Sequence, residues 1–582
     1  MMDHYTWIFA LSVPVAFIAA FGIGANDLAN SFATSVGSKA LTIAQAIMVA
    51  AVCEFLGSIL LGAGVTDTIR SNIANVALYT KSPGLLLYGM FCVQIAAAFW
   101  DNFSCHLELP VSTTHTTVAG VIGMSLVLAG GNSVIWLKHT STFIYITGFV
   151  PVVLSWIVSP ILSGIIVAIM YGLIRTFVLR SKHSFSRAFY LLPFLVALTL
   201  FVITVFIIQT GAKNKQFKNN NIPDGKIIWI SVIVAVGCGL ITLLLVMPYL
   251  RKKAILWDQE QQRLEAENGT AKIAGAHPKA AAPADRHAAT TAPAAHDSDL
   301  KRDAEKGMPE SGDKVGQHPK PVMHHEQVPK LNAFERGMEG MASKIGGCFG
   351  SMGNNACCRA LTNNPVANLV LHGSRYKVHN TLDESDTKNY RAEVAEIWEA
   401  GETFDPKTER LFRYLQVFSA MVMSFAHGSN DVANAMGPFS AVYYIWSTGK
   451  VPKSVPVEIW ILALGGAGIV LGLATYGYLI MRVLGVKVVK LSNTRGFCAE
   501  LSTAITVILA SRFGLPVSTT QVITGALLAV GLFEGRKGVN IWGFIRIFGG
   551  WVLTLIIAGF VAAGVCAFGV FTPNKFAAAS WT

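Results

Sequence analysis

The sequence predicts an all-α membrane protein with about twelve transmembrane segments, arranged as two inverted-topology repeats with interrupted or re-entrant helices. The chain of 582 residues is 52% hydrophobic and only 14% charged, whereas soluble domains carry about 25% charged residues. Many of its apolar runs reach the length of about 20 residues that spans a bilayer. Two polar motifs occur once in each half of the chain. These observations exclude a soluble enzyme.

The predicted segments form two groups separated by a long polar interval. They lie near 5–26, 43–64, 84–104, 111–131, 143–175, 187–210 and 227–249, and again near 411–435, 457–481, 497–511, 516–533 and 541–571. The interval is rich in Ala, His, Pro, Lys and Glu, a composition typical of disorder, and a short helix is predicted at 392–399. We therefore divide the chain into a first transmembrane half at 1–249, which holds the first repeat and extra helices, a largely disordered loop at 250–410, and a second transmembrane half at 411–582.

Short loops rich in Lys and Arg give the predicted orientation. Arg175 and Arg180 follow the fifth run, Arg482 and Lys487 follow the ninth, and all four fall on the side of the central loop. Positive residues favour the cytoplasmic side, so the loop 250–410 is predicted to be cytoplasmic and both termini extracellular. We expect an integral protein of the plasma membrane. The net charge of +12 comes with no groove-binding motif, so no nucleic-acid partner is expected.

An acidic motif marks the repeat. Gly24-Ala-Asn-Asp-Leu-Ala-Asn30 in the first half corresponds to Gly428-Ser-Asn-Asp-Val-Ala-Asn434 in the second, and each copy lies at the end of an apolar run. Asp27 falls on the first predicted segment and Asp431 on the eighth, so the two helices are expected to cross the membrane in opposite directions. Inverted repeats that meet near the midplane are the usual architecture of secondary transporters.

The acidic motif has the composition of a cation site. A carboxylate at membrane depth costs roughly 2.5–3.5 kcal/mol and marks an ion or substrate pathway by default. The asparagines of each copy are one helical turn apart, so amides and carboxylate share one polar face, and oxygen ligands of this kind suit a hard cation such as Na⁺. The predicted Na⁺ ligands are Asn26, Asp27, Asn30, Asn430, Asp431 and Asn434. Two further acids in apolar surroundings, Glu54 and Glu500, are also predicted to bind the cation.

A second motif predicts an anion site. Leu109-Pro-Val-Ser-Thr-Thr114 in the first half matches Leu515-Pro-Val-Ser-Thr-Thr520 in the second. Pro110 and Pro516 cannot continue a helix but suit its first turn, so each is expected to start a half-helix inside the membrane. The hydroxyl groups at the positive helix ends, where anions bind, are those of Ser112, Thr113, Thr114, Ser518, Thr519 and Thr520. An anion beside several carboxylates requires neutralising cations, so the coupling ion is expected to bridge carboxylates and substrate.

Residues beside the two motifs leave alternatives open. His115 follows the first Ser-Thr-Thr sequence and Gln521 follows the second. His115 is either a proton relay or a hydrogen-bonded structural residue. Asp101, Asn102 and Arg512 lie where each run turns towards its proline, and we expect them at the rim of the site.

At these residues the chain resembles the inorganic phosphate transporter (PiT) family. The likeness covers both membrane halves, about 1–249 and 411–571, and leaves out the central loop. It rests on the two motif pairs together, extended by His115 after the first hydroxyl motif and by His427 before the second acidic motif.

The resemblance implies a homodimer of inverted-repeat protomers that carries phosphate with Na⁺ or, in some members, H⁺. It implies phosphate contacts from Asp27, Asp431 and both Ser-Thr-Thr groups, cation ligation by the Asn-Asp-Asn faces, and a functional role for two glutamates, Glu54 and Glu500. The chain departs from the family pattern at two places, where Gln521 replaces a frequent His and Arg512 a frequent Asn. These departures leave the coupling ion and the turnover open.

The expected function is import of inorganic phosphate by a cation-coupled secondary transporter that works by alternating access. Na⁺ symport is preferred, because carboxylates and amide oxygens outnumber histidines beside the site. One alternative is H⁺ coupling through Glu54, Glu500 or His115, and another is a phosphate sensor or surface receptor without transport. No catalytic residue and no cofactor are expected. The expected partners are phosphate, Na⁺, the lipid bilayer and a second copy of the chain.

Overall fold

The computed structural model of the chain describes residues 2–63, 73–139, 146–213, 223–253, 388–451, 457–512 and 517–572, with three isolated positions between 254 and 263. The chain forms two compact units, one made of Met1–Pro248 with Glu339–Thr582 and the other of Tyr249–Met338. By the ranges given above, most of the predicted loop 250–410 lies outside the described residues. The helices that carry the motifs belong to the first unit.

The first half consists of helices, several of which are interrupted. They are α1 (Thr6–Ile23), continued by the π-helical turn η2 (Gly24–Leu28) into α2 (Ala29–Gly37), then α3 (Ile43–Leu61), α5 (Pro83–His106), α6 (Thr113–Ala129), α7 (Phe149–Ile174) with the turn η5 (Arg175–Leu179), α8 (Ser184–Lys213), and α9 (Asp224–Ile241) with the turn η6 (Thr242–Val246). Short 3-10 turns are η1 (Asp3–Tyr5), η3 (Val76–Tyr79) and η4 (Gly131–Ser133), and the strands β1 (Lys138–His139) and β2 (Ile146–Thr147) pair antiparallel before α7.

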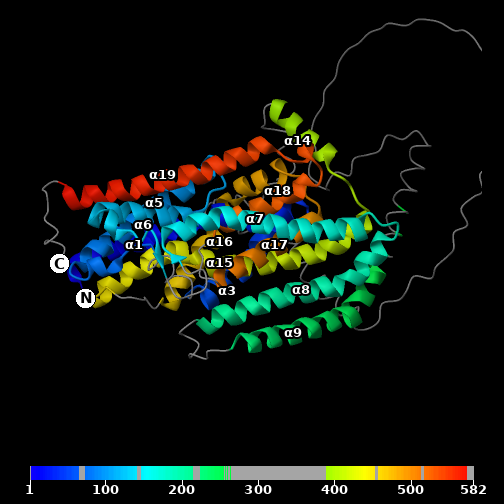
Figure 1. Cartoon of the computed structure of the whole chain (residues 1–582), viewed down its shortest axis with the longest axis horizontal. Helices are drawn as coiled ribbons and strands as arrows, with labels where there is room; N and C mark the ends of the chain where they lie inside the picture. The colour runs from blue at the N-terminus through cyan, green and yellow to red at the C-terminus, as the bar shows by residue number, and fades with distance from the viewer. Residues whose placement is uncertain are drawn as a thin grey trace, which may run out of the picture. The chain divides into compact units, whose positions relative to one another are not determined.

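The part of the chain from residue 388 onwards is also mainly helical. It contains α14 (Lys388–Ala400), α15 (Pro406–Thr448), α16 (Ile459–Arg482) with the π-helical turn η10 (Val483–Lys487), α17 (Asn493–Arg512), α18 (Thr519–Leu532), the 3-10 turn η11 (Arg536–Gly538) and α19 (Ile541–Phe571). The predicted helix at 392–399 is confirmed by α14, which is longer at its start. The N-terminal end of α1 and the C-terminal end of α19 lie at the same end of the helical bundle (Figure 1).

The bundle has the apolar exterior of a membrane protein. Within the described residues, eight helices are long and apolar enough to cross a membrane. Large side chains on their outer faces are well exposed, among them Phe560 at 75%, Trp542 at 74% and Trp229 at 70%. Such a surface is stable only against lipid or another apolar partner. The predicted count of about twelve segments is not confirmed. Neither α15 nor α17 is among the eight, and α6 and α18, with 17 and 14 residues, are too short to span alone.

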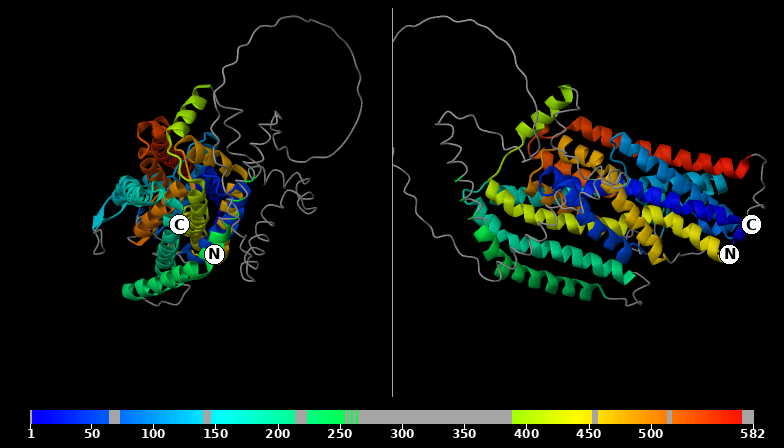
Figure 2. Two further views of the ribbon diagram at one scale, coloured as in Figure 1. Left: turned by 90° about the vertical axis from the view of Figure 1, so that its right-hand side faces the viewer. Right: turned by 180° about the vertical axis from the view of Figure 1, so that it is seen from behind.

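Two helical hairpins hold the hydroxyl motifs. The antiparallel pair α5 and α6 opens at the end of the bundle where α1 begins, and there the Asn75 N–H donates to the Ser133 carbonyl over 2.8 Å (Figure 2). The pair α17 and α18 opens where α15 begins, and Asn493 Nδ2 donates to the Glu409 carbonyl over 3.1 Å. The far end of α15 meets the start of the chain, since the Met2 N–H donates to the Trp446 carbonyl over 2.8 Å. The closed ends of both hairpins therefore point into the bundle.

Glycines in the acidic motifs allow two matching close approaches. A Cβ atom on Gly24 would lie 1.7 Å from the carbonyl oxygen of Ile469 on α16. A Cβ atom on Gly428 would lie 2.2 Å from the carbonyl oxygen of Glu54 on α3. Any side chain at either position would force the helices apart. Each acidic motif is thus pressed against a helix of the other half of the chain.

Candidate functional site

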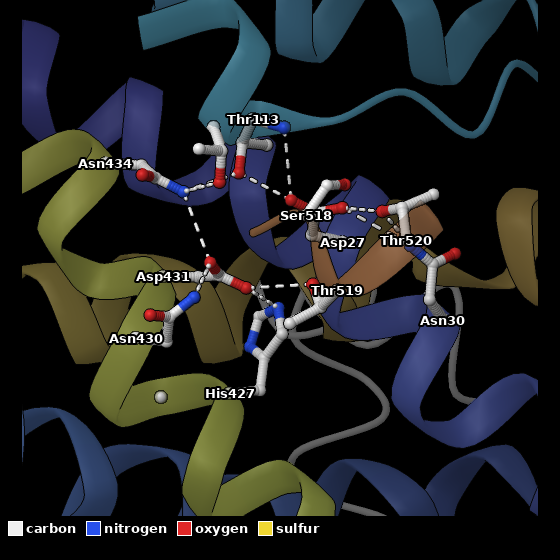
Figure 3. A network of polar contacts seen from close by, with 12 residues as sticks. Asp27, Asn30, Thr113, His427, Asn430, Asp431, Asn434, Ser518, Thr519 and Thr520 are labelled. Carbon is white, nitrogen blue, oxygen red and sulfur yellow. Dashed lines mark hydrogen bonds and ion pairs between the residues drawn. The ribbon is translucent and has the colours of Figure 1, made fainter. Parts of the chain in front are cut away.

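The two acidic motifs and the two hydroxyl motifs meet at one buried place (Figure 3). Asp27 comes from η2 and Asp431 from the middle of α15, while the starts of α6 and α18 contribute the hydroxyl groups. Both aspartates are at most 2% exposed. Residues that are hundreds of positions apart in the chain therefore form one polar cluster inside an apolar bundle.

Each aspartate and its hydrogen-bond partners form one half of the cluster, which we call a half-site. In the first half-site, Asp27 receives hydrogen bonds from both hydroxyl motifs. Its Oδ2 atom accepts from the Thr113 N–H over 3.2 Å and from the Thr113 hydroxyl over 2.5 Å. Its Oδ1 atom accepts from the Asn30 amide over 3.3 Å and also from the Thr520 hydroxyl. Four donors on one carboxylate stabilise its charge.

In the second half-site, Asp431 has the same kinds of partner and one more. Its Oδ2 atom accepts from the Thr519 hydroxyl over 3.0 Å, and its Oδ1 atom accepts from the amides of Asn430 over 3.0 Å and Asn434 over 3.3 Å. In addition, His427 Nε2 lies 2.8 Å from Asp431 Oδ2, which is within ion-pair distance. The second half-site therefore has a titratable base that the first lacks.

The two half-sites are interleaved through their second asparagines. Asn30 Nδ2 donates to the Thr520 hydroxyl over 2.6 Å. In the opposite direction, Asn434 Nδ2 donates to the hydroxyls of Thr113 over 3.0 Å and Thr114 over 3.2 Å. Each acidic motif thus reaches the hydroxyl motif of the other half. A movement of one hairpin has to break bonds in both half-sites.

The hydroxyl motifs form the first turns of two buried helices. Ser112 and Ser518 are N-caps, whose Oγ atoms each accept an N–H three residues later over 3.3 Å. The N–H groups of Thr114 and Thr520 make no hydrogen bond within the described residues, as expected for first-turn donors. The prediction that Pro110 lies in the first helical turn is wrong, because the Ser112 cap starts the helix two residues later; Pro516 lies outside the described residues.

The sequence analysis missed His427 as a site residue. Its Nδ1 atom lies 2.7 Å from Glu54 Oε1, so the imidazole bridges the carboxylates of Glu54 and Asp431. The Ser424 hydroxyl donates to the other oxygen of Glu54 over 3.3 Å. The signal was present in the sequence, since His427 precedes Asp431 by one helical turn and must share its face. Its pairing with Glu54 depends on how α3 packs against α15.

Asn26 and Asn430 occupy equivalent motif positions but have different partners. Asn26 Nδ2 donates to the Ser104 hydroxyl and to the Leu109 carbonyl, both over 3.0 Å, and its Oδ1 atom accepts from the Val111 N–H over 3.0 Å. Asn430 instead donates to the neighbouring carboxylate of Asp431. The hydrogen bonds of Asn26 therefore hold the closed end of the first hairpin. Its role as a cation ligand stays a prediction.

Glu500 lies in a separate polar cluster between α17, α2 and α15. Its Oε1 atom accepts from the hydroxyls of Thr34 over 2.6 Å and Ser35 over 2.8 Å, and from Gln416 Nε2 over 3.4 Å. The Ser419 hydroxyl donates to its other oxygen. All partners are neutral and Glu500 is completely buried, so its carboxylate is surrounded by oxygen atoms that a small cation or a proton can share.

The flanking residues are placed differently from the prediction in one case. The prediction that Asp101 lies at the rim is wrong, because its side chain is 1% exposed and accepts a hydrogen bond from Thr116. Asn102, by contrast, is partly exposed. The side chain of Arg512 lies outside the described residues. His115 is buried with its ring 3.8 Å from the ring of Trp156, measured between centroids. Neither ring nitrogen makes a hydrogen bond among the described residues, so the interpretation as a hydrogen-bonded structural histidine is not confirmed.

The cluster has the donor set of an ion and anion site. Ligand atoms of Asp27, His427 and Asp431 all lie within 4.8 Å of one another, so a single cation can contact both aspartates. Two helix N-termini lie at this cluster, and three of their hydroxyl groups, those of Thr113, Thr519 and Thr520, bond the carboxylates. Helix N-termini and hydroxyl groups bind oxyanions.

Comparisons with known proteins agree with this geometry. Residues 23–562 match the model of the phosphate transporter family. The chain is 31% identical to the phosphate-repressible phosphate permease pho-4 of Neurospora crassa, over 98% of each protein, and 30% identical to sodium-dependent phosphate transporter 1-A of Danio rerio, over 97% of this chain and 95% of that one. A solved structure, the sodium-dependent phosphate transporter, matches with a TM-score of 0.62 and 27% identity over 97% of this chain and 99% of the other. The chain belongs to the phosphate transporter family.

Proposed function

We propose that this protein is a secondary active transporter that imports inorganic phosphate together with Na⁺ by alternating access. The observation that carries the proposal is the interleaving of two Asp-Asn-Thr half-sites at the starts of two buried helices. A buried cluster of carboxylates and hydroxyl groups has no structural use that apolar residues would not serve better. The names of the sodium-dependent relatives support Na⁺ as the coupling ion.

Phosphate is assigned to the space between the two helix starts. The residues that would contact it are Asp27, Ser112, Thr113, Thr114, Asp431, Ser518, Thr519 and Thr520. The hydroxyls and the free N–H groups of Thr114 and Thr520 donate to phosphate oxygens, and both helix dipoles favour the negative charge. A protonated phosphate oxygen can in turn donate to one of the aspartates. The hydroxyl groups that now bond Asp27 and Asp431 would exchange these acceptors for the substrate.

Na⁺ is assigned to the carboxylate side of the same cluster. The proposed ligands are Asn26, Asp27, Asn30, Asn430, Asp431 and Asn434, with Glu54 and Glu500 as further cation-binding residues. Phosphate and two aspartates repel one another in a medium of low dielectric constant, so phosphate binds only when cations are present. This requirement couples the two solutes. Binding of phosphate next to the carboxylates is unfavourable without the cation, and so are buried carboxylates without a cation.

Alternating access follows from the proposed inverted repeats. The two hairpins open at opposite ends of α15, and the matching approaches of Gly24 to α16 and of Gly428 to α3 support an inverted relation between the halves. Symmetry of this kind allows the site to open to either side by exchanging the conformations of the two halves. The interleaved asparagine bonds would break on whichever side opens.

The test is phosphate uptake into proteoliposomes that hold the purified protein. An inward Na⁺ gradient and, separately, an inward H⁺ gradient are applied while the other ion is balanced. Uptake driven by Na⁺ alone is the expected result. Uptake driven only by H⁺ would move the coupling role to Glu54, Glu500 or His115, and phosphate binding without uptake under either gradient would contradict transport.

Three further assignments accompany the transport proposal. The homodimer is tested by the mass of the detergent-solubilised protein in light scattering, where a monomer would contradict it.

The extracellular termini and the cytoplasmic loop 250–410 are tested by protease protection in sealed cells. The plasma-membrane location is tested by fractionation. A loop that is cleaved from the outside would reverse the proposed orientation and leave the site unchanged.

A further inference from the structure

Asp101 on α5 is a buried carboxylate that belongs to neither half-site. Its side chain is 1% exposed, and its Oδ1 atom accepts a hydrogen bond from the Thr116 hydroxyl on α6 over 2.6 Å. Within the described residues no Lys, Arg or His forms an ion pair with it. A carboxylate buried with one neutral hydroxyl is expensive, so its presence calls for a function.

The second hairpin provides an internal control for this pair. The ungapped match of the two hairpins, which aligns Leu109 with Leu515, places Val507 opposite Asp101 and Val522 opposite Thr116. Both valines are buried and pack in one apolar cluster. The hairpin architecture therefore forms with two apolar residues at these positions, and the polar pair of the first hairpin is not required for packing.

The Thr116 hydroxyl has two acceptors within reach. Besides Asp101 Oδ1, it approaches the carbonyl oxygen of Ser112 over 3.2 Å. One hydroxyl proton serves one strong acceptor at a time. When Asp101 is ionised, Thr116 donates to the carboxylate. When Asp101 carries a proton, the acid donates to the Thr116 oxygen and the Thr116 proton turns to Ser112. Both protonation states of Asp101 are therefore hydrogen-bonded.

The charged surroundings of Asp101 connect it to the site. Asp27 on η2 interacts with it electrostatically and has the same sign of charge, and on α5 itself the thiol of Cys105 is the neighbouring titratable group. The one titratable side chain of α6, His115, packs against Trp156. Ser112, the second acceptor of Thr116, caps the helix whose next residue, Thr113, bonds Asp27. A proton on Asp101 thus changes both the charge near Asp27 and the hydrogen bonding of the α6 cap.

We propose that Asp101 is a proton-binding site of the first hairpin, and that its protonation state, relayed through Thr116 to Ser112, sets the affinity of the site for phosphate. The inference rests on the proposed phosphate transport. An ionised Asp101 adds negative charge beside Asp27 and weakens anion binding, whereas a protonated Asp101 removes that repulsion. The KM for phosphate is therefore lower when Asp101 is protonated, and acidification lowers it.

The experiment compares three full-length variants with the wild type in proteoliposomes under a fixed Na⁺ gradient. Asp101→Asn keeps the acceptor for Thr116 and removes the charge. The double variant Asp101→Val with Thr116→Val copies the second hairpin. Asp3→Asn, in the exposed turn η1, is the matched control. The KM and kcat for phosphate are measured across roughly pH 5 to 9, the range in which a buried carboxyl can titrate.

The expected result is that the KM of Asp101→Asn equals the wild-type KM at acidic pH and that the ratio of wild-type to variant KM rises by about tenfold towards alkaline pH. The ionisation of phosphate itself is common to all variants and cancels in this ratio. The double variant should behave like Asp101→Asn, and Asp3→Asn like the wild type.

Two outcomes overturn the inference. In one, the KM profile of Asp101→Asn superimposes on that of the wild type. In the other, Asp101→Asn lowers kcat equally at all pH values together with a fall in unfolding temperature, which shows that the side chain has a structural role. Absence of phosphate uptake by the wild type would instead contradict the proposed function, and this outcome is visible before any variant is compared.

Discussion

The two half-sites share one pattern and differ one helical turn before the aspartate. In the first half that position is Ile23, and in the second it is His427, and both side chains are buried. The backbone opposite the motif glycine differs in the same way, since Gly24 approaches Ile469 and Gly428 approaches Glu54. One half therefore has a buried His-Glu pair at the two positions where the other half has isoleucines. The symmetric residues make up the proposed anion site, and the asymmetric ones add titratable groups to one side of it.

The largest expected effect comes from removing the charge that both halves share. Asp27→Asn and Asp431→Asn should each reduce Na⁺-driven phosphate uptake by roughly 100-fold or more, equivalent to about 2.7 kcal/mol, because the neutral amide cannot offset a cation. Asn keeps the size and an oxygen acceptor, so both variants should remain folded. The measurement is proteoliposome uptake beside the unfolding temperature in detergent. Near-normal transport by either variant would contradict the proposed site.

The second prediction breaks the asymmetry itself. His427→Ile leaves Glu54 buried without its basic partner, and removing one member of a buried pair destabilises by about 3–5 kcal/mol. His427→Ile combined with Glu54→Ile places isoleucine at both positions, as in the first half, and should recover most of that stability. Thermal unfolding of both variants makes the comparison. If the double variant were as unstable as the single one, the His427–Glu54 pair could not be exchanged for two apolar side chains without further changes around it.

A third prediction separates the equivalent asparagines. Asn26→Ala removes the four hydrogen bonds, to Ser104, Cys105, Leu109 and Val111, that hold the closed end of the first hairpin. Each buried group left unpaired costs about 1–3 kcal/mol. Asn430→Ala removes a bond to a carboxylate that keeps two other donors and its His427 contact. Asn26→Ala should therefore lower the unfolding temperature more, while both reduce uptake. Equal losses of stability would show that the tie at Asn26 contributes little.

The smallest effect is expected where the second hairpin opens. The first hairpin opens against an apolar cluster that includes Tyr79 and Leu85, whereas charges gather at the second. Glu402, after α14, accepts from Arg180 Nη2 over 2.8 Å and from Arg175 Nη2 over 2.6 Å, while Arg495 Nη2 lies 2.6 Å from Glu534. The hydrogen bond from Arg180 is the main reason why the pKa of Glu402 is lowered.

The pH dependence follows from the direction of this shift. A lowered carboxyl pKa stabilises the fold above the ordinary value of about 4.3 and loses this contribution as pH falls through the folded-state pKa. Glu402→Gln should therefore lower the unfolding temperature by roughly 1–3 °C at neutral pH, because the pair is partly exposed. The difference from the wild type should vanish under strongly acidic conditions. A difference that persists in acid would show that the packing of Glu402, and not its charge, stabilises this end.

Much of the architecture was predictable from local sequence. Hydrophobic run length predicted the main helices, for example α3 at Ile43–Leu61 against the predicted 43–64, because a helix long enough to span a bilayer must be apolar. The motif pairs predicted which aspartates and hydroxyl groups lie deep in the bundle. The count of about twelve spans was not predictable in the same way, because the apolar runs after Pro110 and Pro516 do not reveal that their helices are short and begin at the closed end of a hairpin inside the bundle.

The sequence by itself determined that the chain has two related membrane halves, each with one buried aspartate and one Ser-Thr-Thr helix start, since motif identity and helical periodicity are local properties. Only the tertiary structure decided that His427 pairs with Glu54, that Asn26 holds a hairpin loop, and that Asp101 is buried against Thr116. The physical reason is that a buried polar group takes whichever donor or acceptor the packing brings to it. In this bundle those partners come from helices that the sequence places far apart.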